Sequence, residues 1–171
     1  MTGAVLSRLN SLPADEAAAE LLKCCGSTRW ASLVAARRQF GDAEELKRAA
    51  DEVWWGLGRA DWLEAFRSHP KIGERKAAAE VSAESRRWSE KEQAGAGSAS
   101  SETLAALAEA NREYEERFGY IFIVCATGKS AEEMLALLRA RLGNDAEDEL
   151  RVAAEEQRRI THLRIEKLLN T

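Results

Sequence analysis

Hydrophobic residues recur with helical spacing along most of the chain. In residues 101–118, for example, Leu104, Leu107, Ala108 and Asn111 recur at the spacing of one helix face. Ala, Leu, Glu and Arg are abundant, and the chain contains only 2 prolines, a composition that favours helices. The pattern predicts an all-α fold, a single-domain bundle of about six to eight helices.

Helix start and stop signals divide this pattern into elements. The first predicted helix begins after Pro13 and carries acidic residues in its first turn. The predicted N-caps of later helices are Ser27 or Thr28, Asp42, Ser82, and Ser130 with Glu133 as a capping box. Gly119 is a natural left-handed stop for the helix before it.

The segment Tyr120–Ala126, YIFIVCA, is the one stretch whose pattern indicates an extended and buried backbone. No second strand is visible to pair with it. Its backbone groups could therefore bind a polar ligand, or neighbouring core groups could satisfy them, and the sequence leaves both interpretations open. Two further stretches are expected to be connections: a surface loop from Pro70 to about Ser82, and the flexible AGAGSASS at 94–101.

Length and charge limit the class of protein. A chain of 171 residues is expected to form one domain, residues 1–171. The net charge of -4 has both signs interspersed, which argues against a nucleic-acid partner. No apolar run approaches the roughly 20 residues that cross a bilayer, and the N-terminus lacks the pattern of a secretory leader. We expect a cytoplasmic protein with no membrane partner.

The three cysteines are Cys24, Cys25 and Cys125. Their odd number and the lack of a Cys-x-x-Cys motif argue against a disulfide framework and against a zinc site. We expect buried free thiols and no metal.

The candidate chemistry begins with His69, one of 2 histidines in the chain. Pro70 disfavours helical backbone at the preceding residue, so the imidazole should lie where an amphipathic helix ends. A histidine at such a place is either a catalytic group or a cap or surface residue.

The last helix places polar residues in its inward-facing arc. Gln157, Thr161 and Arg164 project among apolar positions, and a buried guanidinium requires an ion-pair partner or an anionic ligand. The second histidine, His162, projects toward the opposite edge and is expected at the surface.

The helix after Ser82 carries a third candidate. Trp88 and Glu92 are four residues apart and share a face with Ser85, so that Glu92 lies beside a large apolar ring while Glu90 does not. A histidine, a carboxylate beside Trp, an arginine and a glutamine would suit proton transfer on a small anion. The alternative is that Glu92 is an ordinary solvated acid.

Several sequence blocks, in order and spacing, resemble the 2-oxo-4-hydroxy-4-carboxy-5-ureidoimidazoline (OHCU) decarboxylase family. They are Glu64-Ala65-Phe66…His69-Pro70…Ile72-Gly73, Trp88-Ser89…Glu92-Gln93-Ala94-Gly95, Asn111…Tyr114…Phe118 to Ser130, and Ala153 to Gln157…Ile160-Thr161…Leu163-Arg164. The N-terminal block Leu9…Leu12-Pro13…Glu16-Ala17, with Cys24-Cys25 and Trp30, matches as well. The resemblance covers nearly the whole chain.

The resemblance implies a cofactor-free, all-helical enzyme of urate degradation that forms (S)-allantoin from a small anionic substrate. It assigns catalysis to His69, Glu92 and Arg164. The family's substrate contacts correspond to Pro70, Ser89, Gln93, Ile121, Phe122, Ile123 and Val124. The chain departs from the family between Gly73 and Ser82, where the sequence is rich in Ala and offers little to anchor a lid. Apart from the resemblance, the helical surfaces would be compatible with a homodimer.

Two other functions remain open from the sequence. One is a helical binding module that keeps the fold without the chemistry, and the other is an acid–base enzyme acting on a related ureido or imidazoline anion. Intact His69, Glu92, Gln93 and Arg164 argue against the first.

Overall fold

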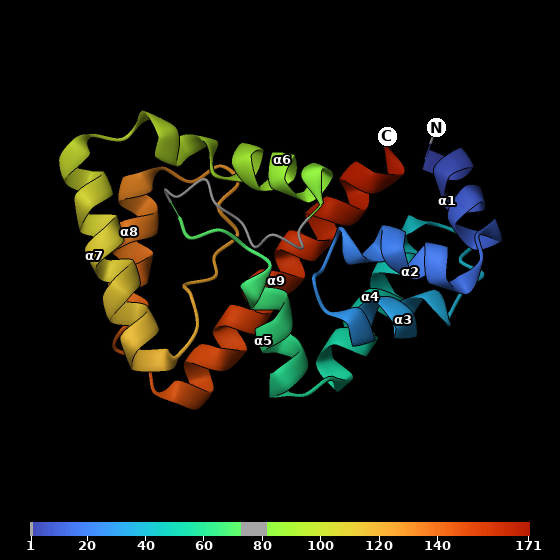
Figure 1. Ribbon diagram of the computed structural model, residues 1–171, viewed down its shortest axis with the longest axis horizontal. Coiled ribbons are helices and arrows are strands. Elements are labelled where there is room, and N and C mark those ends of the chain that lie inside the picture. Colours follow the sequence, from blue (N-terminus) through green and yellow to red (C-terminus); the bar gives the residue numbers. More distant parts are fainter. Residues whose placement is uncertain (1, 73–81) are drawn as a thin grey trace. The chain divides into compact units, whose positions relative to one another are not determined.

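The computed structural model of the chain describes residues 2–72 and 82–171, and the described part contains helices and no strand. The helices are α1 (Thr2–Ser11), α2 (Ala14–Leu22), α3 (Thr28–Ala35), α4 (Ala43–Gly56), α5 (Arg59–Arg67), α6 (Ala83–Glu92), the 3-10 helix η1 (Ala94–Ser98), α7 (Ser101–Phe118), α8 (Ala131–Arg141) and α9 (Ala146–Leu169) (Figure 1). The all-α fold is confirmed. α1 was not expected, because its inward face has only Leu6 and Leu9 as buried residues.

The predicted caps begin the helices as expected. The Ser27 side chain accepts the Trp30 N–H, Asp42 accepts the Glu45 N–H at 2.8 Å, and Ser82 accepts the Ser85 N–H. Ser130 and Glu133 form the predicted capping box of α8. Gly119 ends α7 with a φ of 84°, in the left-handed region where a side chain would be strained.

The chain forms two compact units. Residues up to Ala65 and Arg158–Thr171 make the first unit, and Phe66–Gln157 make the second, so α5 and α9 contribute residues to both. In the first unit α2 packs against α3 and α3 against α4 (Figure 1). Fully buried Trp30 ties α3 to α4 by donating its indole N–H to the Ala50 carbonyl at 3.1 Å. The expectation of one domain over residues 1–171 stays a prediction.

The second unit has an aromatic core. α7 and α8 lie side by side (Figure 1). The ring of Tyr114 lies 4.7 Å from Phe118, 5.8 Å from Tyr120 and 5.4 Å from Phe122, between ring centroids. Burial of rings of this size, with tilted or edge contacts, is among the strongest sources of core stability.

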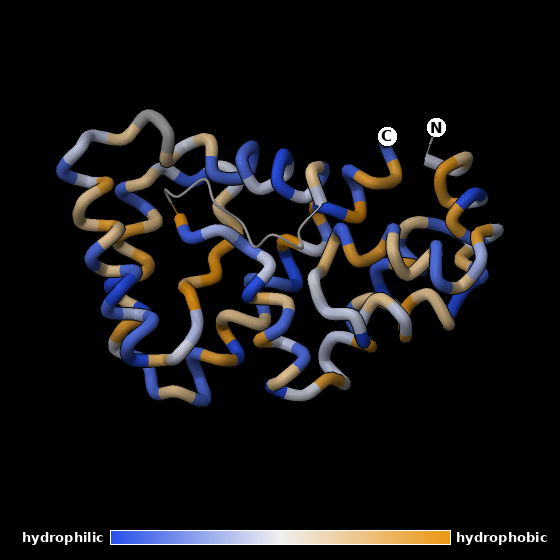
Figure 2. Tube along the Cα trace, in the orientation of Figure 1, coloured by the Kyte–Doolittle hydropathy of each residue, from blue (hydrophilic) through white to orange (hydrophobic). Residues whose placement is uncertain are grey.

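The predicted buried segment runs through this core without forming a strand. Residues 121–126 are non-helical and appear as an apolar stretch in Figure 2. The Arg141 guanidinium donates to the Ile123 carbonyl at 2.7 Å and lies 4.4 Å from the centroid of the Phe122 ring. Glu149, which is 0 % exposed, accepts from Arg141 Nε at 2.5 Å. A buried ion pair therefore replaces the missing strand partner at this carbonyl.

One of the two expected connections is helical in the structure, and most of the other lies outside the described residues. Residues 94–98, expected to be flexible, form η1, in which Ala96 is buried. Gly95 approaches the chain after the buried segment so closely that a Cβ would lie 2.3 Å from the Lys129 carbonyl oxygen. Glycine is needed there for its small size. Of the expected 70–82 loop, residues 73–81 lie outside the described residues.

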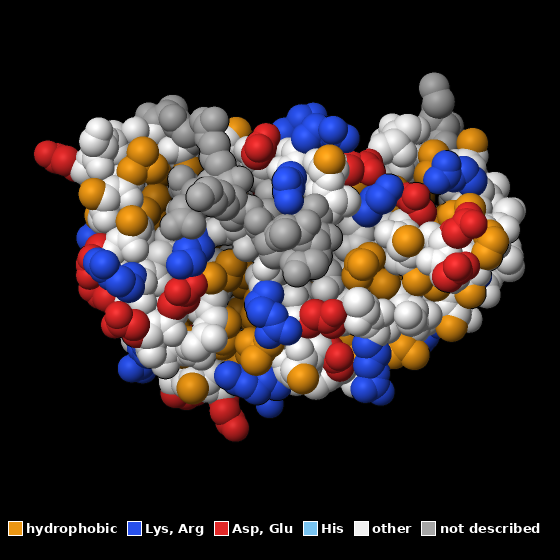
Figure 3. Space-filling view, viewed as in Figure 1, with side chains coloured by type: hydrophobic (Ala, Val, Ile, Leu, Met, Phe, Trp, Pro, Cys, Tyr) orange, Lys and Arg blue, Asp and Glu red, His pale blue; other side chains and the backbone are white. Residues whose placement is uncertain are grey.

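The distribution of charges and the state of the cysteines are as the sequence predicts. Acidic and basic side chains are interspersed on the face shown in Figure 3. All three cysteines are free and buried. Within residues 2–72 and 82–171, no helix is long and apolar enough to cross a membrane, and no group of three or more His, Cys, Asp or Glu could hold a metal ion.

Replacing Glu149 by Ala should destabilise the fold by about 3–5 kcal/mol, because it leaves the Arg141 charge buried without this carboxylate. Chemical denaturation with the transition followed by circular dichroism measures the change. Glu147→Ala, an exposed acid in the first turn of the same helix, is the control and should cost within about 1 kcal/mol. Equal stability of the two variants would contradict the structural role given to Glu149.

The stability of the fold should also fall in alkali through Cys25. Burial raises the pKa of its thiol from 9.0 to about 12, so above pH 9 the unfolded chain loses a proton that the folded chain keeps. The free energy of unfolding should therefore decrease by about 1.4 kcal/mol per pH unit from this group between the two values. Denaturation of wild type and Cys25→Ala at pH 9.5 and 11 measures it. If the free energy of unfolding fell equally with pH in the two proteins, the loss of stability would not come from Cys25.

Candidate active site

His69 lies just beyond the end of α5, as the His-Pro sequence predicts. Its backbone N–H donates to the Phe66 carbonyl at 3.2 Å, and Pro70 behind it is buried. The imidazole is half-buried. Its Nε2 lies 2.6 Å from Oε1 of Gln157, so a side chain of α9 holds the ring.

The polar row predicted on α9 is buried. Gln157 is 0 % exposed, Thr161 4 % and Arg164 3 %. Burial of uncharged or charged polar groups is costly unless each group has a partner. For Gln157 that partner is His69.

Glu156, the residue before Gln157 on α9, binds the non-helical segment of the second unit. Its Oε1 accepts the backbone N–H of Cys125 at 3.2 Å, inside the non-helical segment. Glu156 was not among the predicted site residues, although its spacing from Ala153 and Ile160 indicates an inward position. One turn of α9 thus binds both the candidate imidazole and the buried segment.

Glu92 lies on the buried face of α6 beside Trp88, as predicted. Ser85, Trp88, Ser89 and Glu92 are buried, and Glu90 is exposed. Gln93 follows as the C-cap and is half-buried. The interpretation of Glu92 as an ordinary solvated acid is therefore wrong.

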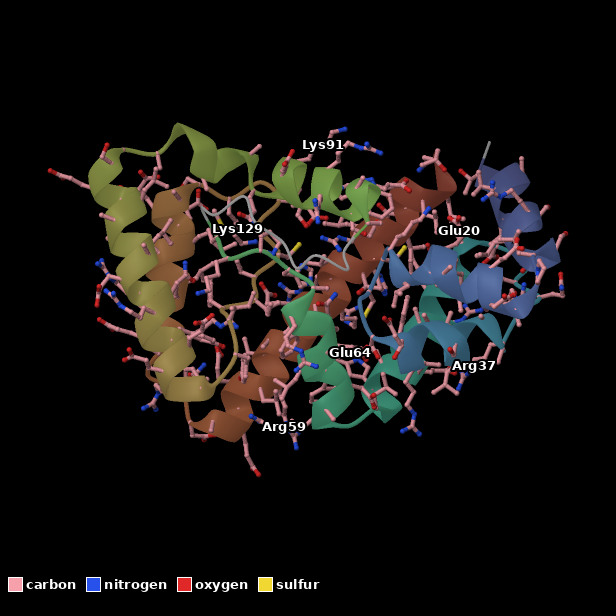
Figure 4. All side chains as sticks on the ribbon, viewed as in Figure 1. Glu20, Arg37, Arg59, Glu64, Lys91 and Lys129 are labelled. Carbon is pink, nitrogen blue, oxygen red and sulfur yellow. The ribbon has the colours of Figure 1, made fainter. Side chains whose placement is uncertain are left out.

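Cys125 lies within electrostatic range of Glu92. Burial, and then the charges of Glu156 and Glu92, raise the pKa of the Cys125 thiol, while the Lys129 ammonium lowers that pKa. Lys129, labelled in Figure 4, also donates to the Cys125 carbonyl at 2.8 Å. Contacts and charges thus link His69, Gln157, Glu156, the Cys125 backbone and Glu92 within the second unit.

The other predicted contact residues belong to the same unit. Ser89 is 4 % exposed, Phe122 2 %, Ile123 2 % and Val124 5 %, while Ile121 is half-buried. The Ile123 carbonyl accepts a hydrogen bond from Arg141, which was not among the predicted site residues.

Arg164 lies in the first unit. Its guanidinium is within electrostatic range of the Cys25 thiol. Burial raises the pKa of that thiol to about 12, and the Thr161 hydroxyl and the Arg164 charge oppose this rise in part. The charge of Glu64 on α5, labelled in Figure 4, raises the pKa of the same thiol. Glu64 also accepts hydrogen bonds from Thr28. The burial of Arg164 is confirmed.

His162 differs from the expectation of a surface residue. Its side chain is 26 % exposed, and Nε2 lies 2.7 Å from Oδ1 of Asp51 and 3.5 Å from Nη1 of Arg158. The ring thus contacts the Asp51 carboxylate of α4 and lies near the Arg158 guanidinium of its own helix, α9.

The chain is similar to known proteins over most of its length. It is 37% identical over 148 residues to an Arabidopsis thaliana protein described as a bifunctional uric acid degradation protein, covering 86% of this chain and 45% of that one. It is 33% identical to the OHCU decarboxylase of Amia calva, covering 81% of this chain and 79% of that protein.

Solved structures give the same relationship. A crystal structure of OHCU decarboxylase with (S)-allantoin matches with a TM-score of 0.75 and 35% identity over 89% of this chain and 98% of that one. A crystal structure of (S)-allantoin synthase, at 19% identity, has a TM-score of 0.72, covers 95% of this chain and 53% of that one, and shows a shared fold. The family model described as OHCU decarboxylase matches residues 10–166, and the chain therefore belongs to the OHCU decarboxylase family.

Proposed function

We propose that this chain decarboxylates 2-oxo-4-hydroxy-4-carboxy-5-ureidoimidazoline to (S)-allantoin in urate degradation. Family membership over residues 10–166 supports this function. The structural observation that carries it is His69, a half-buried imidazole held at a helix end by a fully buried amide. The activity proposed is that of a carboxy-lyase and does not extend to a second activity of the longer bifunctional relatives.

The chemistry of the substrate explains how a protein without a redox or pyridoxal group could perform this reaction. When carbon dioxide leaves the hydroxyl-bearing ring carbon, the remaining electron pair can move into the adjacent carbon–nitrogen double bond. The substrate is its own electron sink. The ring nitrogen that receives the electron pair takes up one proton from solvent. The protein then needs to orient the anion, accept the hydroxyl proton and deliver a proton to the ureido-bearing carbon.

Each proposed catalytic residue has a role that suits its chemistry. His69 delivers the proton to one face of the ureido-bearing carbon, which yields a single enantiomer. Glu92 hydrogen-bonds the hydroxyl or ureido group, and its burial beside Trp88 supports a role in a site shielded from water. Arg164 binds the anion with its planar fork of donors, a role supported by its burial and by the family resemblance.

Substrate contacts are proposed for two parts of the second unit. Pro70, Ser89 and Gln93 are near the ends of α5 and α6, and Ile121, Phe122, Ile123 and Val124 form the non-helical segment. In that segment Arg141 and Glu156 bind the Ile123 carbonyl and the Cys125 N–H, which supports a fixed backbone there. We also propose that the enzyme works in the cytoplasm as a homodimer.

A coupled assay that starts from urate, with urate oxidase and the ring-opening hydrolase supplied, tests the function. Accelerated formation of (S)-allantoin supports it. A folded protein that leaves the rate and handedness of allantoin formation unchanged would instead favour a binding module. Consumption of a different ureido or imidazoline anion would favour the related acid–base enzyme.

His69→Ala should remain folded and lose about 10²–10⁴ in the rate of decarboxylation, the range of general acid–base assistance. The coupled assay with circular dichroism of the product measures the loss. His162→Gln, which changes the other histidine, is the control and should keep most activity. Near-normal (S)-allantoin formation by folded His69→Ala would exclude the proposed proton donor.

Arg164→Lys should lower kcat/KM by at least about tenfold, because an ammonium cannot reproduce two parallel hydrogen bonds to a carboxylate. Arg159→Lys, an exposed arginine on the same helix, is the matched control. Steady-state kinetics of both variants give the comparison. If Arg164→Lys turned over substrate like wild type, the arginine would be a structural residue.

A further inference from the structure

The contact between His69 and Gln157 constrains the protonation state of the imidazole. The atom of Gln157 that faces Nε2 is Oε1, at 2.6 Å, and an amide oxygen can only accept a hydrogen bond. Nε2 must therefore carry the proton of this bond. In the neutral ring the lone pair then belongs to Nδ1.

The position of Gln157 makes this constraint rigid. The side chain is 0 % exposed, and it lies on α9 between buried Ala153 and Thr161. The neighbouring Glu156 binds the Cys125 N–H, so the same helical turn is also fixed against the non-helical segment. A partner held in this way can select one tautomer and one ring orientation.

The nature of the partner matters as well. An amide oxygen orients the ring without the negative charge that would stabilise the imidazolium. His162 provides the contrast in the same chain, since its Nε2 faces the Asp51 carboxylate at 2.7 Å. At Nε2, therefore, the histidine proposed for catalysis contacts an amide oxygen, and the other histidine contacts a carboxylate.

We propose that Gln157 is a positioning residue that keeps His69 in the Nε2–H tautomer, so that Nδ1 is the nitrogen that exchanges a proton with the substrate. In each turnover Nδ1 gains a proton from the substrate hydroxyl or from solvent and gives it to the ureido-bearing carbon. The Nε2–H bond is not broken, and the ring returns to its starting state. The assignment to proton transfer rests on the proposed function, whereas the tautomer does not.

Nitrogen-15 NMR of the imidazoles tests the tautomer directly, because the chain has only 2 histidines. His162→Gln assigns the two sets of signals. Neutral His69 in the wild-type protein should show a protonated Nε2 and an unprotonated Nδ1. The opposite tautomer, or a mixture of the two, would overturn the proposal whether or not the protein turns over OHCU.

Two variants test the consequence for catalysis. Gln157→Leu removes the acceptor at similar size and should give a mixture of His69 tautomers, with kcat lower by about 10–100-fold and KM within about threefold. Gln157→Glu keeps an acceptor, so it should keep the tautomer but raise the pH at which His69 titrates by about one unit or more. If Gln157→Leu does not fold, the Gln157→Glu spectra and pH profile of kcat decide the question.

The outcomes separate this proposal from the function on which it depends. A folded Gln157→Leu with the wild-type tautomer and wild-type kcat would overturn the positioning role. That role would also be overturned if Gln157→Glu left both the titration of His69 and the pH profile of kcat unchanged. Absence of OHCU turnover in the wild-type protein, with the Nε2–H tautomer observed, would overturn only the proton-transfer step and the proposed function.

Discussion

Buried polar groups need partners, and in the second unit α9 supplies three buried polar side chains that bind other elements. Glu149, Glu156 and Gln157 are each at most 9 % exposed, and each contacts a group on another element. Leaving any of these groups without a partner would cost a desolvation penalty of about 1–3 kcal/mol, and more for the charged groups. The three partners are Arg141, the Cys125 N–H and His69, so their positions all depend on α9.

The non-helical segment follows from the same arrangement. A buried stretch without a strand partner needs other donors and acceptors for its backbone, or it will not remain in the core. Arg141 supplies a donor to the Ile123 carbonyl, Glu156 an acceptor for the Cys125 N–H, and Lys129 a donor to the Cys125 carbonyl. These side chains allow an irregular backbone to lie among aromatic rings, and an irregular backbone can present groups to a ligand that helices would bond internally.

The sequence predicted the fold where local chemistry decides the structure. Caps at Ser27, Asp42, Ser82 and Ser130, and the stop at Gly119, depend on residues within a few positions, and all are confirmed. Helix α1 was missed because two buried leucines give a weak periodic signal. The 3-10 helix η1 was missed because Gly and Ala suggest flexibility, whereas here their small size permits close packing against Lys129.

The positions of single candidate residues on their helices could be predicted from the sequence, but the contacts between residues on different elements could not. Helical periodicity placed Gln157 and Glu92 on buried faces, and the His-Pro pair placed His69 at a helix end. Periodicity describes one helix at a time, so it could not pair His69 with Gln157, 88 positions away in sequence. Arg141 lacked any signal because its partners, Glu149 and Ile123, are on two other elements.

The two histidines show why the identity of a hydrogen-bond partner matters more than burial alone. Both rings are half-buried, but Asp51 and Arg158 surround His162 with charges, whereas His69 contacts a neutral amide through Nε2. A carboxylate partner adds a negative charge beside a ring, whereas an amide oxygen orients a ring without adding charge. A proton-transfer group works best when neither protonation state is strongly favoured near the working pH. On this reasoning the neutral partner at position 157 suits catalysis better than a carboxylate would.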